Sequence, residues 1–261
     1  MRNIGLRLIS ILFYILFLGF FLIIFPLHFF FLLGKNRRLH NAAHFLNKIW
    51  GWIIMYPVGV YLHPINRQVV DPKQVYVFAP NHSSYLDIPI CNVSIKNTFR
   101  FIGKAELNKL PLFGYMFSRL HISVNRASRT DSYKSFVRAK EKLSEGTSVL
   151  VFPEGTFPDK TKVTLMRFKD GAFRMAIENK VPIVPMAVLN ADRALLDDGK
   201  WLIRPGKVTV IFHEPIDTSE MTLEDAPALK KRVRDWIYNT LVENGCKREP
   251  GEPGSRPPVR T

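Results

Sequence analysis

The fold is decided by the stretch VYVFAPNHSSYLDIPICNVS, residues 75–94. Its first five residues are apolar and mostly β-branched or aromatic, which predicts a short buried strand over Val75–Ala79. A polar loop follows, and Tyr85–Ser94 is expected to form a helix. A strand that leads through a short loop into a helix is the repeating unit of α/β proteins.

The rest of the chain repeats this unit. The further strands expected are Phe99–Ile102, Ile122–Val124, Ser148–Phe152, Ile183–Val188 and Val208–Phe212. The further helices expected are Leu112–Leu120, Ser132–Ser144, Gly171–Asn179 and Leu223–Asn244. This alternation predicts an α/β fold with a mostly parallel, helix-covered sheet. Ligands bind such sheets outside the carboxyl ends of the strands.

The N-terminus predicts a membrane-embedded helix pair joined to this domain. Leu8 to Leu33 contains no Lys, Arg, Asp or Glu, and it is longer than the bilayer core requires. A second apolar stretch, residues 42–62, follows a basic turn at residues 35–38. Basic flanks on both sides leave a single span and a hairpin in one leaflet open. A signal peptide and a buried soluble helix pair are weaker alternatives, because no small-residue cleavage site follows and many aromatic residues would need cover.

Domain limits and partners follow from composition. We expect a membrane-associated hairpin over residues 1–65, the α/β domain over 66–247 and a disordered tail over 248–261. The net charge of +15 lies in residues 1–70 and 96–142, which favours an anionic membrane or phosphorylated substrate. Nucleic acid is not expected, since no zinc-finger or RNP-like motif is present. Two unpatterned cysteines predict neither a disulfide framework nor a metal site.

His82 and Asp87, five positions apart at the predicted mouth of a strand, are the candidate catalytic pair. A histidine can take a proton from an alcohol, and a carboxylate can hold its tautomer and stabilise the imidazolium that forms. An ordinary loop histidine next to a helix-turn carboxylate is the competing interpretation. No Gly-x-Ser-x-Gly elbow surrounds the neighbouring serines, so they are not expected to be nucleophiles.

The run Phe152–Thr156 follows another predicted strand and is the candidate substrate-binding turn. Gly155 permits a tight turn and close approach of a ligand. Glu154 can accept hydrogen bonds from hydroxyl groups, and Thr156 can bind oxygen atoms. Lys104 and Arg126 each lie just beyond a strand and are candidates for phosphate contact.

Three motifs in order, HSSYLD (82–87), FPEGT (152–156) and VPIVP (181–185), resemble the glycerolipid acyltransferase family. Between the first two lie KAEL (104–107), PLFG (111–114) and VNR (124–126). The resemblance covers roughly residues 75–188 and is specifically to 1-acylglycerol-3-phosphate acyltransferases of bacterial phospholipid synthesis. The family's usual N-terminal membrane-embedded helix pair is also similar to residues 4–62 here.

The resemblance implies transfer of an acyl group from acyl-CoA or acyl-carrier protein to the sn-2 hydroxyl of lysophosphatidate. His82 would be the general base, Asp87 would orient it, and Glu154, Gly155 and Thr156 would grip the glycerol phosphate. No cofactor or metal is implied. The implied location is the bacterial inner membrane, with the catalytic domain on the cytoplasmic side.

One position departs from the family pattern. Related sequences commonly place Arg directly after Glu-Gly-Thr, where this chain has Phe157. A phosphate-binding donor is then either missing or supplied by one of four other cations: Lys160, Lys162, Arg167 or Lys169. Another lyso-lipid acceptor and a catalytically silent membrane protein that binds anionic lipid therefore remain alternatives.

Overall fold

The computed structural model describes residues 2–125, 127–157, 164–195 and 199–246. The predicted tail, 248–261, lies outside these residues. The helices are α1 (Arg2–Phe31), α2 (Arg37–Met55), α3 (Asp87–Ser94), α4 (Phe113–Leu120), α5 (Arg129–Ser144), α6 (Gly171–Glu178), α7 (Ala191–Ala194) and α8 (Ala226–Glu243). The strands are β1 (Val60–Ile65), β2 (Val77–Pro80), β3 (Phe99–Lys104), β4 (Ile122–Val124), β5 (Ser148–Leu150), β6 (Ile183–Leu189) and β7 (Gly206–Phe212). Short 3₁₀ turns occur at Tyr56–Val58, Arg67–Val69, Ala105–Lys109 and Leu223–Asp225.

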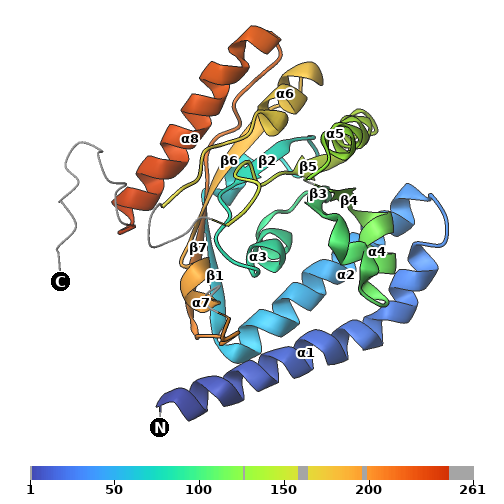
Figure 1. Cartoon of the computed structure of the whole chain (residues 1–261), viewed down its shortest axis with the longest axis vertical. Coiled ribbons are helices and arrows are strands. Elements are labelled where there is room, and N and C mark those ends of the chain that lie inside the picture. Colours follow the sequence, from blue (N-terminus) through green and yellow to red (C-terminus); the bar gives the residue numbers. More distant parts are fainter. Residues whose placement is uncertain (1, 126, 158–163, 196–198, 247–261) are drawn as a thin grey trace.

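The strands form one sheet in the order β1-β7-β6-β2-β5-β3-β4 (Figure 1). Neighbouring strands are parallel except for β6 and β7, which pair antiparallel. The predicted mostly parallel, helix-covered sheet is confirmed. All six expected strands are present, with ends shifted by at most two residues, within the usual uncertainty of boundaries read from a sequence.

The strand β1 was not predicted. It pairs in parallel with β7, from Val60 opposite Gly206 to Ile65 opposite Ile211. The sheet therefore begins before residue 66, inside the range expected to be a helical hairpin. As an edge strand with one neighbour, β1 leaves much of its length exposed, and His63 and Pro64 interrupt its apolar pattern.

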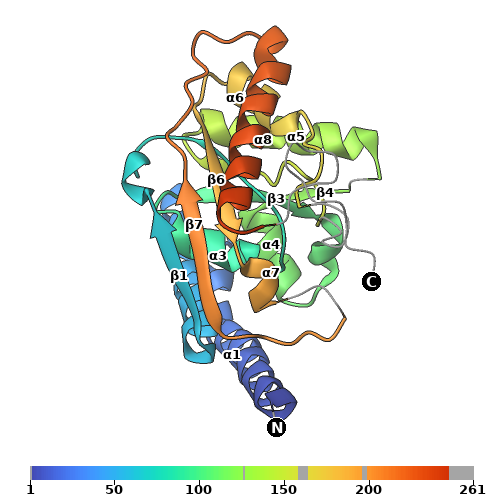
Figure 2. The same cartoon turned by 90° about the vertical axis from the view of Figure 1, so that its left-hand side faces the viewer.

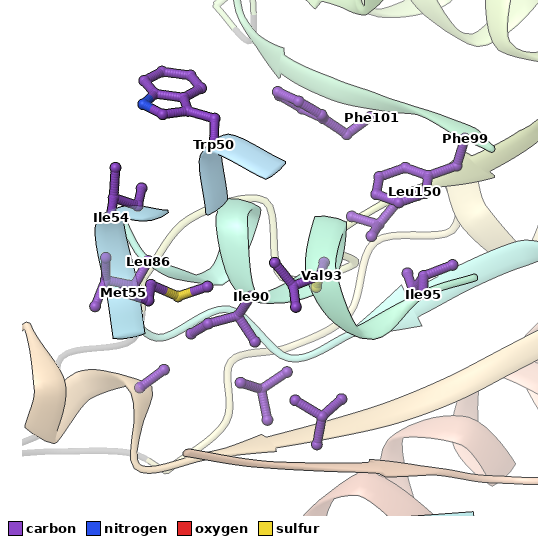
Figure 3. Close-up of a cluster of buried hydrophobic side chains, with 14 of the residues drawn as sticks. Trp50, Ile54, Met55, Leu86, Ile90, Val93, Ile95, Phe99, Phe101 and Leu150 are labelled. Carbon is purple, nitrogen blue, oxygen red and sulfur yellow. The ribbon is translucent and has the colours of Figure 1, made fainter. Parts of the chain in front are cut away.

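Helices cover both faces of the sheet, and each face has its own apolar core. Side chains alternate along a strand, so Val77 and Ala79 pack against α5, α6 and α8 whereas Phe78 packs against α2 and α3. Figures 1 and 2 show α8, α6 and α5 on one side of the sheet, with α2, α3 and α4 on the other. Figure 3 shows part of the second core, where Trp50 and Ile54 of α2 lie near Ile90 of α3 and Phe101 of β3.

The helix α1 lies along the outside of α2 and carries most of the exposed apolar surface (Figure 1). Residues 4–31 are long and apolar enough to cross a bilayer, with a mean hydropathy of 2.9, and 22% of that window is buried. Length and composition alone support this, and they give weak evidence of membrane association. The helix is tied to the domain by hydrogen bonds from Trp50 Nε1 to Phe17 O, 3.0 Å, and from Tyr115 Oη to Phe29 O, 3.2 Å.

The helix α2 is sandwiched between α1 and the domain. Its buried face includes Asn47, Trp50, Gly51 and Ile54, and it packs against α3. The two helices approach closely because Gly51 has no side chain: a Cβ atom there would lie only 2.9 Å from Val93 Cγ2 of α3. The second apolar stretch of the sequence is therefore largely an internal helix.

Candidate active site

The loop after β2 carries His82 and is held in place by two neighbouring segments. Asn81 pairs with the backbone of β6 through both ends of its amide: Nδ2 donates to Val188 O at 3.0 Å, and Oδ1 accepts from Val188 N at 2.7 Å. Ser84 Oγ donates to Leu195 O at 2.9 Å. These bonds fix the loop at the carboxyl edge of the sheet, where α/β proteins bind ligands.

His82 and Asp87 form a hydrogen-bonded pair, with Nδ1 and Oδ2 2.8 Å apart. Asp87 begins α3 and is fully buried, and the same oxygen accepts the backbone N–H groups of Ser83 at 2.5 Å and Ser84 at 2.9 Å. A carboxylate held in this way accepts the Nδ1 proton, so Nε2 carries the free lone pair. The His82 side chain is 12% exposed.

Aromatic rings surround His82 on both sides. The Phe152 ring stacks on the imidazole with centroids 3.9 Å apart and planes at 16°, and the Phe157 ring meets it at 4.3 Å and 60°. Tyr85 contacts Phe157 at 4.9 Å and Trp201 at 5.0 Å. Phe157, at the position where related sequences commonly have arginine, thus packs on the His82 and Tyr85 rings.

Glu154 is buried at 2% exposure, and its carboxylate faces the backbone. Oε1 accepts the N–H of His82 at 2.6 Å, and Oε2 accepts the N–H of Met166 at 2.8 Å. The carboxylate thus joins the loop after β2 to the segment before α6. A direct contact between Glu154 and the substrate stays a prediction.

The remaining predicted site residues are placed as follows. Lys104 is the last residue of β3 and lines the same cavity as His82. Thr156, in the turn after β5, also lines it. Gly155 has a φ of 71°, as a tight turn requires, and lines a separate, smaller cavity. Arg126 lies outside the described residues.

A cavity of about 490 Å³ opens at His82 and runs between α2 and β3. Its wall is mainly apolar and comes from α1, α2, α3, β3 and α4, including Phe13, Phe17, Trp50, Ile54, Ile88, Phe101 and Phe113. The sequence offered no way to select these side chains from the many other apolar residues. A long hydrocarbon chain matches both its chemistry and its position.

Three buried polar residues also line this cavity: Asn47, Asn92 and His121. Asn47 Oδ1 lies 3.0 Å from His28 Nε2. Burial, together with the positive charge of Arg100, holds the pKa of His121 well below its usual value, so its ring is neutral. Among the described residues, no group of three His, Cys, Asp or Glu side chains could hold a metal ion.

Comparisons with known proteins identify the family and the fold that the chain resembles. The family described as Acyltransferase matches residues 62–189. The crystal structure of the 1-acyl-sn-glycerophosphate (LPA) acyltransferase PlsC from Thermotoga maritima aligns with a TM-score of 0.71 and 25% identity, covering 95% of this chain and 99% of that one. The chain belongs to the acyltransferase family.

Several curated relatives bear the name 1-acyl-sn-glycerol-3-phosphate acyltransferase. One from Chlamydomonas reinhardtii is 29% identical over 84% of this chain and 64% of its own length. The chloroplastic LPAT1 of Arabidopsis thaliana is 31% identical over 71% of this chain and 51% of its own length. A relative from Saccharomyces cerevisiae is 26% identical over 82% of this chain and 70% of its own. The chain thus spans about half to two thirds of the length of the first two.

Proposed function

We propose that this acyltransferase moves a fatty acyl group from an acyl thioester to the sn-2 hydroxyl of lysophosphatidate, giving phosphatidate. The observation that carries the proposal is a His82–Asp87 pair that opens directly onto a large apolar cavity. Curated relatives named for this activity support the acceptor.

The chemistry follows from the orientation of the imidazole. Asp87 accepts the Nδ1 proton, so His82 Nε2 takes the proton of the acceptor hydroxyl as its oxygen attacks the thioester carbonyl carbon. The tetrahedral intermediate then collapses and breaks the C–S bond, and the thiolate leaves with the proton held by the imidazolium. No acyl-enzyme forms, and no cofactor is needed.

Positioning of two bound substrates supplies much of the rate, because a bimolecular reaction becomes effectively unimolecular. The apolar cavity is the proposed site of the acyl chain, where each buried methylene contributes about 0.8 kcal/mol. Phe152 and Phe157 exclude water from the imidazole, which protects the thioester from hydrolysis.

We place the enzyme at the bacterial inner membrane, with its α/β domain on the cytoplasmic side. The exposed apolar surface of α1 supports membrane attachment, and both substrates carry chains that partition into lipid. The proposed donor is acyl-CoA or acyl-carrier protein. Either is anionic, and the basic stretch at residues 96–142 attracts both.

The test is an acyl-transfer assay with purified protein in lipid vesicles, one donor of each type and several acceptors. We expect phosphatidate from lysophosphatidate, and a loss of about 10²–10⁴-fold in turnover for His82→Ala, the scale of a missing general base. Asp87→Asn should also lose activity, because the amide cannot hold the same tautomer.

Phe157 favours one second candidate, an acceptor without a phosphomonoester. If 1-monoacylglycerol or lysophosphatidylcholine is turned over as fast as lysophosphatidate or faster, the acceptor is to be reassigned to that lipid. Full function of His82→Ala would instead indicate a silent lipid-binding protein.

A further inference from the structure

A row of aromatic rings leads from His82 to the surface of the protein. Phe157 contacts His82 at 4.3 Å between ring centroids, and Tyr85 contacts Phe157 at 4.9 Å. The row ends at Trp201, in the loop that precedes β7, whose ring centroid lies 5.0 Å from that of Tyr85. Tyr85 is 46% exposed and Trp201 is 48% exposed, and both line the cavity that contains His82. The two rings therefore form part of the edge of this cavity and still present apolar area to the outside.

The backbone around Trp201 is tied to the helix α1. Tyr14 Oη donates to Trp201 O at 2.9 Å, and Ser10 Oγ accepts from Ile203 N at 2.8 Å. Trp201 has a φ of 55°, in the left-handed region that few residues other than glycine adopt. Such a conformation persists where surrounding contacts hold it, and it is common at functional sites. The two hydrogen bonds from α1 are contacts of this kind.

The same segment is tied to the loop that carries His82. Leu195 forms a β-bridge with Ile203, and Leu195 O accepts the hydroxyl of Ser84 at 2.9 Å. Ser84 lies two residues after His82. The segment around Trp201 thus connects α1 with the loop after β2, and the Trp201 ring lies between them.

The surface of α1 beside Tyr14 is apolar and exposed. Ile11, Ile15 and Leu18 lie within four residues of Tyr14 in the same helix, and each is more than half exposed. Exposed apolar surface of this kind is typical of a membrane-facing region, and Trp and Tyr rings favour the headgroup depth of a bilayer. A surface suited to lipid therefore continues from α1, through Tyr14, to the ring of Trp201.

We propose that Tyr85 and Trp201 form the entrance by which a lysolipid acceptor passes from the membrane to His82, and that the acceptor's own hydrocarbon chain binds on their exposed rings. This inference rests on the proposed function. The acceptor keeps one hydrocarbon chain while its free hydroxyl reacts, so its site has to open toward lipid. The main cavity is the proposed site of the donor chain, and the half-exposed rings at its edge offer apolar area for the second chain.

The first test measures kcat/KM in vesicles for 1-oleoyl and 1-hexanoyl lysophosphatidate, which have the same headgroup. The hexanoyl chain is too short to cover much of the two rings. Trp201→Ala should therefore lower the oleoyl-to-hexanoyl ratio of kcat/KM about 4- to 12-fold, the value for losing half of a buried aromatic side chain. Trp201→Phe should keep most of the ratio, and Tyr85→Ala should lower it. Tyr133→Ala removes an exposed ring from α5, on the other face of the sheet, and should leave it unchanged.

The second test needs no turnover. Lysophosphatidate with a brominated chain quenches tryptophan fluorescence on contact, and excess unbrominated lysophosphatidate reverses the quenching that arises at a specific site. Trp201→Phe should lose this reversible part of the quenching. Trp52→Phe is the matched control and should keep it, because Trp52 is 45% exposed but lies on α2 and does not line the main cavity.

The outcomes separate this inference from the proposed function. Wild-type protein that does not acylate lysophosphatidate overturns the proposed function, and the reversible quenching then still decides whether a lysolipid binds at Trp201. Wild-type turnover with an unchanged ratio in Trp201→Ala overturns the entrance alone, as does reversible quenching that survives in Trp201→Phe. An equal loss with both acceptors indicates a structural role for Trp201 and also overturns it.

Discussion

Replacing Glu154 with glutamine tests whether this carboxylate holds the active site together. In the folded protein each of its oxygens accepts one backbone N–H, from His82 and from Met166. The amide of glutamine has one acceptor and one donor group, so it can satisfy only one of these two N–H groups. The other backbone N–H stays buried without an acceptor and faces the NH₂ group of the glutamine.

The expected cost follows from this count. A hydrogen bond to a charged group contributes about 1.5–3 kcal/mol, and the unpaired N–H adds to the loss. We therefore expect the free energy of unfolding to fall by about 2–3 kcal/mol and the melting temperature by roughly 4–12 °C. The His82 loop also shifts, and a misplacement of this kind lowers kcat by up to about 10²-fold.

The assay combines thermal unfolding in detergent with kcat and KM for the acceptor. Glu178→Gln is the matched control, because Glu178 pairs with Lys140 at the surface, where such pairs contribute about 1 kcal/mol or less. If Glu154→Gln kept its melting temperature and kcat but raised the acceptor KM, Glu154 would act on the substrate, and its role as a backbone clamp would be refuted.

Two more predictions concern the main cavity. Gly103 lines it, and a Cβ there would lie 2.7 Å from Phe117 Cζ and 3.0 Å from Phe101 Cε2. Gly103→Ala should destabilise the protein by about 1–3 kcal/mol and shift donor preference toward shorter chains, measured with an acyl-CoA length series; an unchanged chain profile would show that the acyl chain binds elsewhere. His121 has a pKa below its unfolded value of 6.5, so below pH 6.5 the unfolded chain binds a proton that the folded one does not. The free energy of unfolding should then fall by about 1.4 kcal/mol per pH unit on acidification below 6.5, and His121→Phe should remove this part of the slope. Denaturant unfolding at pH 7.5 and pH 5.5 measures both slopes, and equal slopes would contradict the assignment.

The sheet was predictable from the sequence because buried parallel strands are short continuous apolar runs between turn residues. β6 shows this well, since all seven of its residues are buried. β1 lacked that signal: it is an edge strand with one buried end. Its partner β7 is far along the chain, and a single sequence does not reveal such pairing.

The hydrogen-bonded pairing of His82 with Asp87 was predictable because the two residues are close in sequence and follow a strand. The contacts of Glu154 were not, because its partners belong to segments that come together only in the folded chain. The same holds for the stacking of Phe152 on His82 and for the packing of Lys169 on Gly155. Motif spacing identifies such residues without showing which neighbour each one faces.

The pairing of β1 with β7 has a consequence for biosynthesis. β1 directly follows the helices α1 and α2, yet its only partner in the described sheet is β7, the last of the seven described strands to be synthesised. The apolar α1 is synthesised before every strand of this sheet, so it is exposed while the sheet is still incomplete. β1, which follows α1 and α2, can join the edge of the sheet only after β7, Gly206–Phe212, has been synthesised. With the membrane attachment proposed above, α1 would reach the bilayer before the sheet is complete at β1, and the last steps of folding would take place beside the lipid.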